Sequence, residues 1–206
     1  MKTITTVLSF IICGSFMFSQ NSSMSSDDYL ARAPIYDYTE SALNNTDTIP
    51  DFENKSNKLK ITGTVYLSDG VTPVKDAIIY IYQHDDNGKL IYNETKGKKH
   101  IEHRAWVKTD ANGNYTFYTF VPGEAIVPLT YPRQLGPKQI YPTVMVEGQE
   151  PFNIPAFMFE DDPLITKNCR RRLKRKGIDC ILNPIEKDGI LVAEKNIVLP
   201  KDSTNF

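Results

Sequence analysis

The chain has 206 residues, enough for one domain with extensions at its ends. It carries 24 Lys and Arg against 25 Asp and Glu, so its overall charge gives no reason to expect binding of nucleic acid or of a membrane surface. Aromatic residues make up 11% of the chain, which is ample for a packed core.

The first 20 residues have the pattern of a secretory signal peptide. Lys2 supplies the positive charge, and residues 7–18 are mostly apolar. That stretch is shorter than the roughly 20 residues that span a membrane. We therefore expect a periplasmic or secreted protein that is not integral to the membrane. Cys13 raises the alternative of a lipoprotein, but it follows two isoleucines where a small residue is usual.

Composition divides the remainder into three parts. Residues 21–58 are rich in Ser, Asn, Asp and Thr and show little hydrophobic periodicity, which predicts a flexible leader. One apolar patch at 29–36 leaves open that part of the leader docks on the domain. The predicted domain covers 59–200, and 201–206 form a tail.

Short strands separated by turns dominate the predicted domain. Residues 59–67 alternate between apolar and polar, as a half-buried strand does. Strands are predicted at 105–109 and 114–120, and the Asn112–Gly113 pair between them favours a hairpin. Further strands are predicted at 77–82, 140–147, 155–159, 190–192 and 196–199, the last two as a closing hairpin.

One helix is predicted late in the chain. Residues 166–176 contain good helix formers, and Gly177 suits the position that follows a helix. Many short strands with a single helix favour a mostly-β fold, a single β-sandwich.

Several motifs occur in an order that resembles the intradiol ring-cleavage dioxygenases, the family of protocatechuate and catechol dioxygenases. They lie at 63–83, 109–117, 121–123, 159–164 and 188–194. The resemblance implies a prealbumin-like sandwich over about 59–199. It also implies a non-haem Fe(III) site with two Tyr and two His ligands, because anionic phenolates stabilise the hard ferric ion and imidazoles complete the shell.

The residues at the implied histidine positions are different in this chain. The family's R-P-A-H-I-H strand corresponds to residues 136–141, so Gln139 and Tyr141 stand where the two histidines belong. Gly136 replaces the arginine, and Ala156 replaces a glutamine further on.

The implied tyrosine ligands are also altered. Ala125 stands at one tyrosine position, although Tyr131 lies at the right distance from Gln139 for the shorter-loop version of the motif. Leu90 stands at the other position, and Tyr92 follows two residues later on the same face of a strand.

These replacements leave two hypotheses. The first is an exported, non-catalytic binding or structural module that has lost Fe(III) and binds a small aromatic or envelope ligand. The alternative is a non-haem Fe(III) dioxygenase with altered ligation that cleaves a catechol-type aromatic. We favour the first, because a neutral amide such as Gln139 is a weak ligand and cannot replace an imidazole.

The three histidines, His84, His100 and His103, are interpreted as solvated loop residues. A remade metal site that uses His103 with Tyr92, Tyr131 and Tyr141 remains open.

Three further features are ambiguous in the sequence. Cys169 and Cys180 would pair in an oxidising compartment or remain free thiols. The basic run Arg170–Lys176 predicts either an anionic partner or a solvated helix face. Glu160–Asp162 would bind calcium or, more in keeping with the resemblance, precede the helix.

Overall fold

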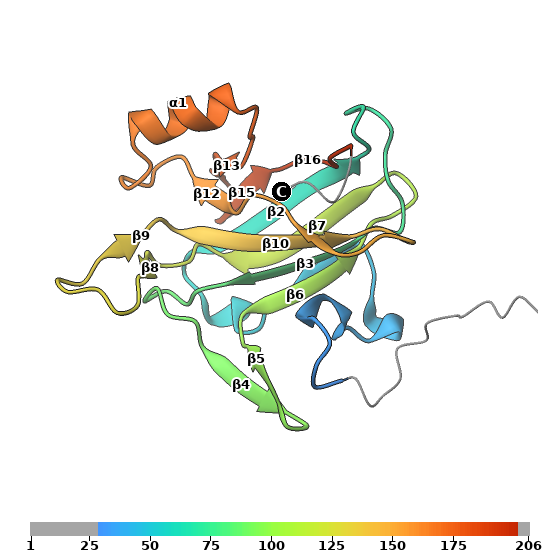
Figure 1. Cartoon of the computed structure of the whole chain (residues 1–206), viewed down its shortest axis with the longest axis horizontal. Coiled ribbons are helices and arrows are strands. Elements are labelled where there is room, and N and C mark those ends of the chain that lie inside the picture. Colours follow the sequence, from blue (N-terminus) through green and yellow to red (C-terminus); the bar gives the residue numbers. More distant parts are fainter. Residues whose placement is uncertain (1–28, 202–206) are drawn as a thin grey trace, which may run out of the picture.

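The structure is a computed structural model that describes residues 29–201. Two β-sheets face each other, and the single α-helix of these residues lies at the edge of the sandwich (Figure 1). The predicted signal peptide and residues 202–206 of the predicted tail lie outside the described residues. No helix in the part of the chain that is described has the length and apolar character needed to cross a membrane.

The first sheet has the order β1-β7-β2-β15-β14, with β16 also paired to β2. Its strands are β1 (Thr46–Thr48), β2 (Lys58–Tyr66), β7 (Asn114–Phe120), β14 (Ile185–Lys187), β15 (Ile190–Glu194) and β16 (Ile197–Val198). The second sheet has the order β13-β12-β10-β3-β6, with β11 paired to β10. Its strands are β3 (Ile78–Gln83), β6 (Arg104–Lys108), β10 (Gln139–Met145), β11 (Phe152–Asn153), β12 (Phe157–Phe159) and β13 (Ile181–Leu182).

The smaller elements lie outside the two sheets. Two hairpins stand apart from it, β4 (Tyr92–Thr95) with β5 (Lys98–Ile101), and β8 (Ala125–Ile126) with β9 (Leu135–Gly136). The helices are η2 (Pro34–Tyr36), η3 (Glu40–Ala42), η4 (Phe52–Asn54) and α1 (Lys167–Arg175).

The core forms where alternate residues of the two sheets meet. In β2, Leu59, Ile61 and Val65 are fully buried, while Lys60, Thr62 and Thr64 are partly exposed. They join a cluster with Ile81 of β3 and Ile140 of β10 from the other sheet. This shared core confirms the predicted β-sandwich.

The predicted hairpin at Asn112–Gly113 is wrong in its pairing. Strand β6 pairs with β3 of the second sheet, whereas β7 pairs with β2 of the first. The turn itself is tight, since the Asp110 carboxylate accepts hydrogen bonds from the backbone N–H groups of Asn112 and Asn114, and Gly113 has a φ of 74°. Asn-Gly favours a tight turn but does not determine which strands pair, and here the turn carries the chain from one sheet to the other.

The predicted closing hairpin is also wrong. Strands β15 and β16 both run parallel to β2 and pair with successive parts of it. Between them Lys195 is buried, and its N–H donates to the carbonyl of Thr62. The hairpin lies earlier, where β14 turns at Asp188–Gly189 into β15.

The segment from residue 29 to 57 is folded onto the domain, which corrects the predicted flexible leader. Strand β1 pairs with β7, and Ile35, Ile49 and Phe52 are buried. Ile35 belongs to the apolar patch at 29–36, whose docking the sequence left open, whereas Ile49 and Phe52 are isolated apolar residues without a periodic signal.

A buried ion cluster attaches the same segment to strand β5. The Asp37 carboxylate is 2.8 Å from the Arg32 Nε and 2.7 Å from the Lys98 Nζ, and all three side chains are largely shielded from solvent. Lys98 also donates to the carbonyl of Arg32. The carboxylate is therefore neutralised by two cations from different elements.

Replacement of Ile35 by Ala should lower the free energy of unfolding by about 2–5 kcal/mol, because it leaves a cavity beneath the docked segment. Urea denaturation measures the change. The control Leu30→Ala removes a side chain that is 63% exposed and should change stability by less than about 0.5 kcal/mol. Equal, small effects of both changes would mean that the segment is not part of the folded unit.

Candidate functional site

The two residues at the implied histidine positions share one surface. In β10, Ile140 points into the core, so the pleat turns Gln139 and Tyr141 to the outer face of the second sheet. The Tyr141 hydroxyl donates a hydrogen bond to the Gln139 Oε1 at 2.9 Å. The Tyr141 hydroxyl thus has an acceptor, and the Gln139 carbonyl oxygen has a donor.

Tyr141 belongs to a continuous row of aromatic rings across three strands. Its ring stacks on Tyr82 of β3 with centroids 4.9 Å apart and planes 15° apart. Tyr82 contacts Tyr80 at 5.9 Å, and Tyr80 contacts Trp106 of β6 at 5.1 Å. We call Tyr80, Tyr82, Trp106 and Tyr141 the aromatic face.

A cation borders the aromatic face. The Arg104 guanidinium lies over the Trp106 ring, 4.9 Å from its centroid. Its Nη1 is buried and has no hydrogen-bond partner among the described residues. An unpaired buried donor is costly, so a bound acceptor that reached this atom would relieve that cost.

The phenols of the aromatic face are held in the neutral form. Burial raises the pKa of Tyr141, and the neighbouring Tyr82 raises it further. Burial also raises the pKa of Tyr82, with a further contribution from Tyr92. A tyrosine binds ferric iron as the phenolate, so this environment opposes the form that ligation needs.

His84 is a residue of this site that the sequence interpretation missed. It is buried rather than solvated, and its ring centroid lies 5.8 Å from that of Tyr141. Its Nδ1 is buried without a partner among residues 29–201. Burial lowers its pKa, which favours the neutral imidazole. A signal was present, because Tyr80 and Tyr82 alternate along β3 and His84, two residues further on, directly follows that strand.

His103 is also buried, but it does not join the aromatic face. Its ring meets Phe120 edge-on at 5.0 Å. Burial lowers its pKa, and the Lys55 ammonium lowers it further. The interpretation as a solvated loop residue is therefore wrong for His103 as well as for His84, whereas His100 is partly exposed.

The two remaining candidate tyrosines do not complete a coordination shell. Tyr92 is 49% exposed on β4, although it lies near enough to Tyr82 to affect its pKa. Tyr131 is fully exposed in the loop between β8 and β9. The structure thus brings Gln139 and Tyr141 together with Tyr92 nearby, and places His103 and Tyr131 elsewhere.

These residues do not fit a ferric ion. The donors on the aromatic face are an amide, a neutral phenol hydrogen-bonded to that amide, and one imidazole, whereas Fe(III) favours anionic oxygen donors. Across residues 29–201 no group of three or more His, Cys, Asp or Glu is arranged to hold a metal.

The other ambiguous features have structural explanations. The Asp162 carboxylate accepts hydrogen bonds from the backbone N–H groups of Lys138 and Leu164, so it organises the approach to α1. Cys169 and Cys180 are free thiols, which differs from the disulfide alternative. They pack in one cluster beneath α1, with Cys180 buried and Cys169 partly exposed.

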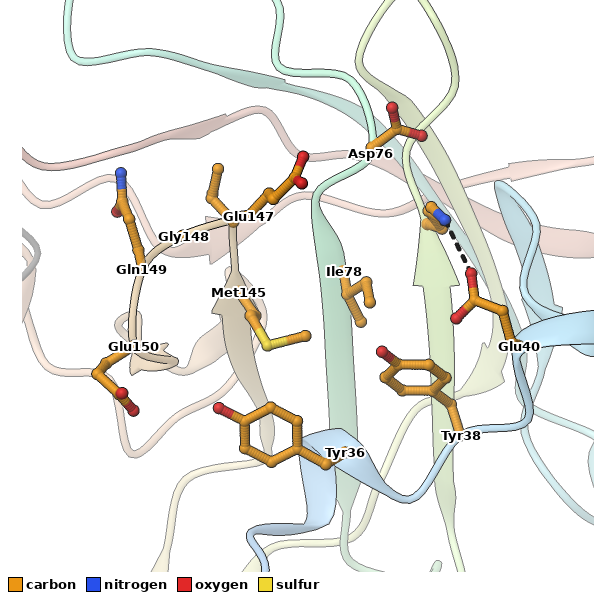
Figure 2. A pocket seen from close by; sticks show the side chains of 12 residues that line it. Tyr36, Tyr38, Glu40, Asp76, Ile78, Met145, Glu147, Gly148, Gln149 and Glu150 are labelled. Carbon is orange, nitrogen blue, oxygen red and sulfur yellow. Dashed lines mark hydrogen bonds and ion pairs between the residues drawn. The ribbon is translucent and has the colours of Figure 1, made fainter. Parts of the chain in front are cut away.

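A cavity of about 770 Å³ lies beside the docked N-terminal segment, near the start of β3 (Figure 2). Tyr36, Tyr38, Ile78 and Met145 form its less polar part, and its carboxylates come from Glu40, Asp76, Glu147 and Glu150. The single cation in its lining, Lys108, is 3.0 Å from Glu40. This cavity is acidic and does not suit an anionic aromatic ligand.

Several solved structures with a similar fold are named as dioxygenases. The dioxygenase domain of a dioxygenase–carbohydrate-binding protein fusion from Streptomyces sp. SirexAA-E is 17% identical, with a TM-score of 0.53 over 81% of this chain and 98% of that one. A catechol 1,2-dioxygenase from an Acinetobacter species is 18% identical, with a TM-score of 0.59 over 75% of this chain and 56% of that one. The 3-chlorocatechol 1,2-dioxygenase of Rhodococcus opacus is 19% identical, with a TM-score of 0.59 over 78% and 68%.

The chain therefore has the β-sandwich fold of the intradiol dioxygenases, as the sequence motifs predict. It spans about half the length of the Acinetobacter enzyme and nearly all of the Streptomyces domain. No family model matches the sequence, and no curated protein matches it.

The two buried histidines should make stability depend on pH. Their pKa values in the folded protein lie below the ordinary 6.5, so the unfolded chain takes up protons first on acidification. Their contribution to the free energy of unfolding is full above pH 6.5 and declines as the pH falls towards the folded pKa values.

Urea denaturation at about pH 7.5 and about pH 5.5 tests this dependence. The double variant His84→Gln, His103→Gln should lose less stability over this interval than the unaltered protein. Identical losses in the two proteins would show that these imidazoles are not responsible.

Proposed function

We propose that the protein is an exported, non-catalytic binding module that retains the intradiol dioxygenase fold without its iron chemistry. Its ligand is a small planar aromatic molecule that binds on the aromatic face. The module acts in the periplasm or outside the cell, which accords with the predicted signal peptide.

The hydrogen bond between Tyr141 and Gln139 carries this proposal. At the positions where the resemblance implies two imidazoles, the chain has two neutral groups that satisfy each other. To bind iron, the phenol would have to lose its proton and its amide partner. Burial opposes that loss, since it raises the pKa of Tyr141.

The aromatic rings support an aromatic ligand. Tyr82 and Tyr141 are partly exposed and already stacked, so a further planar ring extends the stack. Three groups supply polar recognition at the edge of the face: the Arg104 Nη1, the His84 Nδ1 and the Gln139 amide. A phenolic or carboxylic substituent on the ligand would pair with the unpartnered donor of Arg104.

The alternative function is a ferric dioxygenase with altered ligation. His84 is the observation in its favour, because its unpartnered imidazole lies beside Tyr141. One imidazole and one phenol still fall short of the donor set that the resemblance implies.

A measurement of oxygen consumption distinguishes the binding module from the ferric dioxygenase. The purified protein, treated with ferric salt and freed of unbound iron, should consume no oxygen above background when catechol is added. A catechol 1,2-dioxygenase taken through the same procedure is the positive control. Ring cleavage of catechol by this protein would establish the alternative.

Titration with catechol tests the binding site. Trp106 is the only tryptophan of the chain and belongs to the aromatic face, so its fluorescence should change on binding. Tyr141→Ala should weaken binding about 3- to 10-fold, the equivalent of one stacking contact. Tyr131→Ala, at a fully exposed ring away from the face, is the matched control and should bind as the unaltered protein does. Equal affinities of the two variants would contradict a site on the aromatic face.

A further inference from the structure

Helix α1 carries a concentration of positive charge that the aromatic face does not explain. Residues 167–176 include seven of the 24 Lys and Arg and no acidic residue, so the rest of the chain has 17 basic against 25 acidic residues. The net charge of the chain is near zero because the basic residues 167–176 offset an excess of acidic residues elsewhere.

One side of α1 packs against the protein and the opposite side carries cations. Cys169 and Leu173 pack into the cluster beneath the helix. Four exposed cations have the spacing i, i+4, i+7 and i+8, which places them on the side turned away from that cluster. This cationic stripe consists of Lys167, Arg171, Lys174 and Arg175.

The cationic stripe has no acidic partner within the described residues. Of the seven cations in 167–176, Arg170 alone forms an ion pair there, with Glu160. Because like charges on adjacent turns of a helix repel, the unneutralised stripe costs stability. An external anionic surface would relieve that cost.

Two hollows with apolar walls adjoin the C-terminal end of α1. The first has a volume of about 360 Å³, with Leu173, Ile178 and Ile181 in its lining and Arg170 and Lys174 at the helix. The second, of about 390 Å³, shares Ile178 and continues to Phe157, Ile197 and Val198, the last of which is 53% exposed.

The single carboxylate in the lining of both hollows is neutralised. Asp179 lies 2.7 Å from the Lys195 Nζ. The surface therefore combines apolar hollows with a cationic border and has no free negative charge in those linings.

We propose that α1 and the two hollows form a docking surface for a bilayer of anionic phospholipid. Each Lys or Arg close to such a surface contributes to binding. The helix is convex and contains no aromatic residue, so it offers neither a groove for a polymer nor stacking for bases or sugars. The apolar hollows favour lipid over a purely polar polyanion.

Vesicle sedimentation tests the proposal with the purified protein. It should bind vesicles of phosphatidylcholine and phosphatidylglycerol in equal amounts, and should not bind phosphatidylcholine alone. Binding should disappear at about 0.5 M NaCl, because salt screens the attraction. Dissolved glycerol phosphate at the same phosphate concentration should not displace the vesicles. Binding to phosphatidylcholine alone would overturn the proposal.

A matched pair of variants locates the surface. The quadruple variant Lys167→Gln, Arg171→Gln, Lys174→Gln, Arg175→Gln should bind the anionic vesicles at least about tenfold more weakly. The control replaces four other exposed lysines by Gln and so removes the same charge: Lys75, Lys89, Lys96 and Lys99. The control should retain most of the binding, and an equal loss in both variants would refute a role for α1.

A neutral substitution distinguishes lipid from a soluble polyanion. Val198→Gln removes an exposed apolar side chain from the second hollow and leaves the charge unchanged. It should weaken binding to anionic vesicles about threefold or more while leaving binding to heparin, a soluble polyanion, unaltered. Unchanged vesicle binding, or tight heparin binding without vesicle binding, would contradict docking on a bilayer.

Discussion

The inward position of Ile140 determines what the outer face of the second sheet presents. Its side chain is completely buried between the two sheets, so its neighbours Gln139 and Tyr141 must face outwards. On that face the Tyr141 ring stacks on Tyr82, and its hydroxyl donates a hydrogen bond to the Gln139 amide oxygen. The sandwich core is thus that of a fold that elsewhere occurs in dioxygenases, while Gln139 and Tyr141 on its outer face are neutral and hydrogen-bonded to each other.

The outer face is divided by the segment that docks on it. Ile35 and its neighbours pack on Ile78, Tyr80 and Trp106, and the aromatic face continues from there to Tyr82, Tyr141 and His84. Helix α1 lies at another part of the molecule, beside β12 and β13 (Figure 1). Recognition of an aromatic ligand and contact with a charged surface would therefore use separate regions.

Local patterns predicted the elements better than their partners. Alternation at 59–67 correctly indicated β2, and Gly177, with a φ of 66°, ends α1 as expected. The pairing of β6 and β7 could not be read from Asn112–Gly113, because a tight turn suits both a hairpin and a crossing between sheets. Docking of the patch at 29–36, which contains Ile35, was left open by the sequence, whereas Ile49 and Phe52 were missed because each is a single apolar residue in a polar stretch.

The candidate site was predictable where residues share a strand. Spacing along β10 placed Gln139 and Tyr141 together, but spacing through loops misjudged Tyr131, which is fully exposed. His84 was overlooked because its partner Tyr141 is distant in sequence and meets it only through the pairing of β3 with β10.

The iron content of the protein tests the central claim most directly. After incubation with ferric salt and removal of unbound metal, elemental analysis should find far less than one iron per chain. The solution should also lack the visible absorption band of tyrosinate bound to Fe(III). One tightly held iron per chain, with that band, would contradict this account of the site.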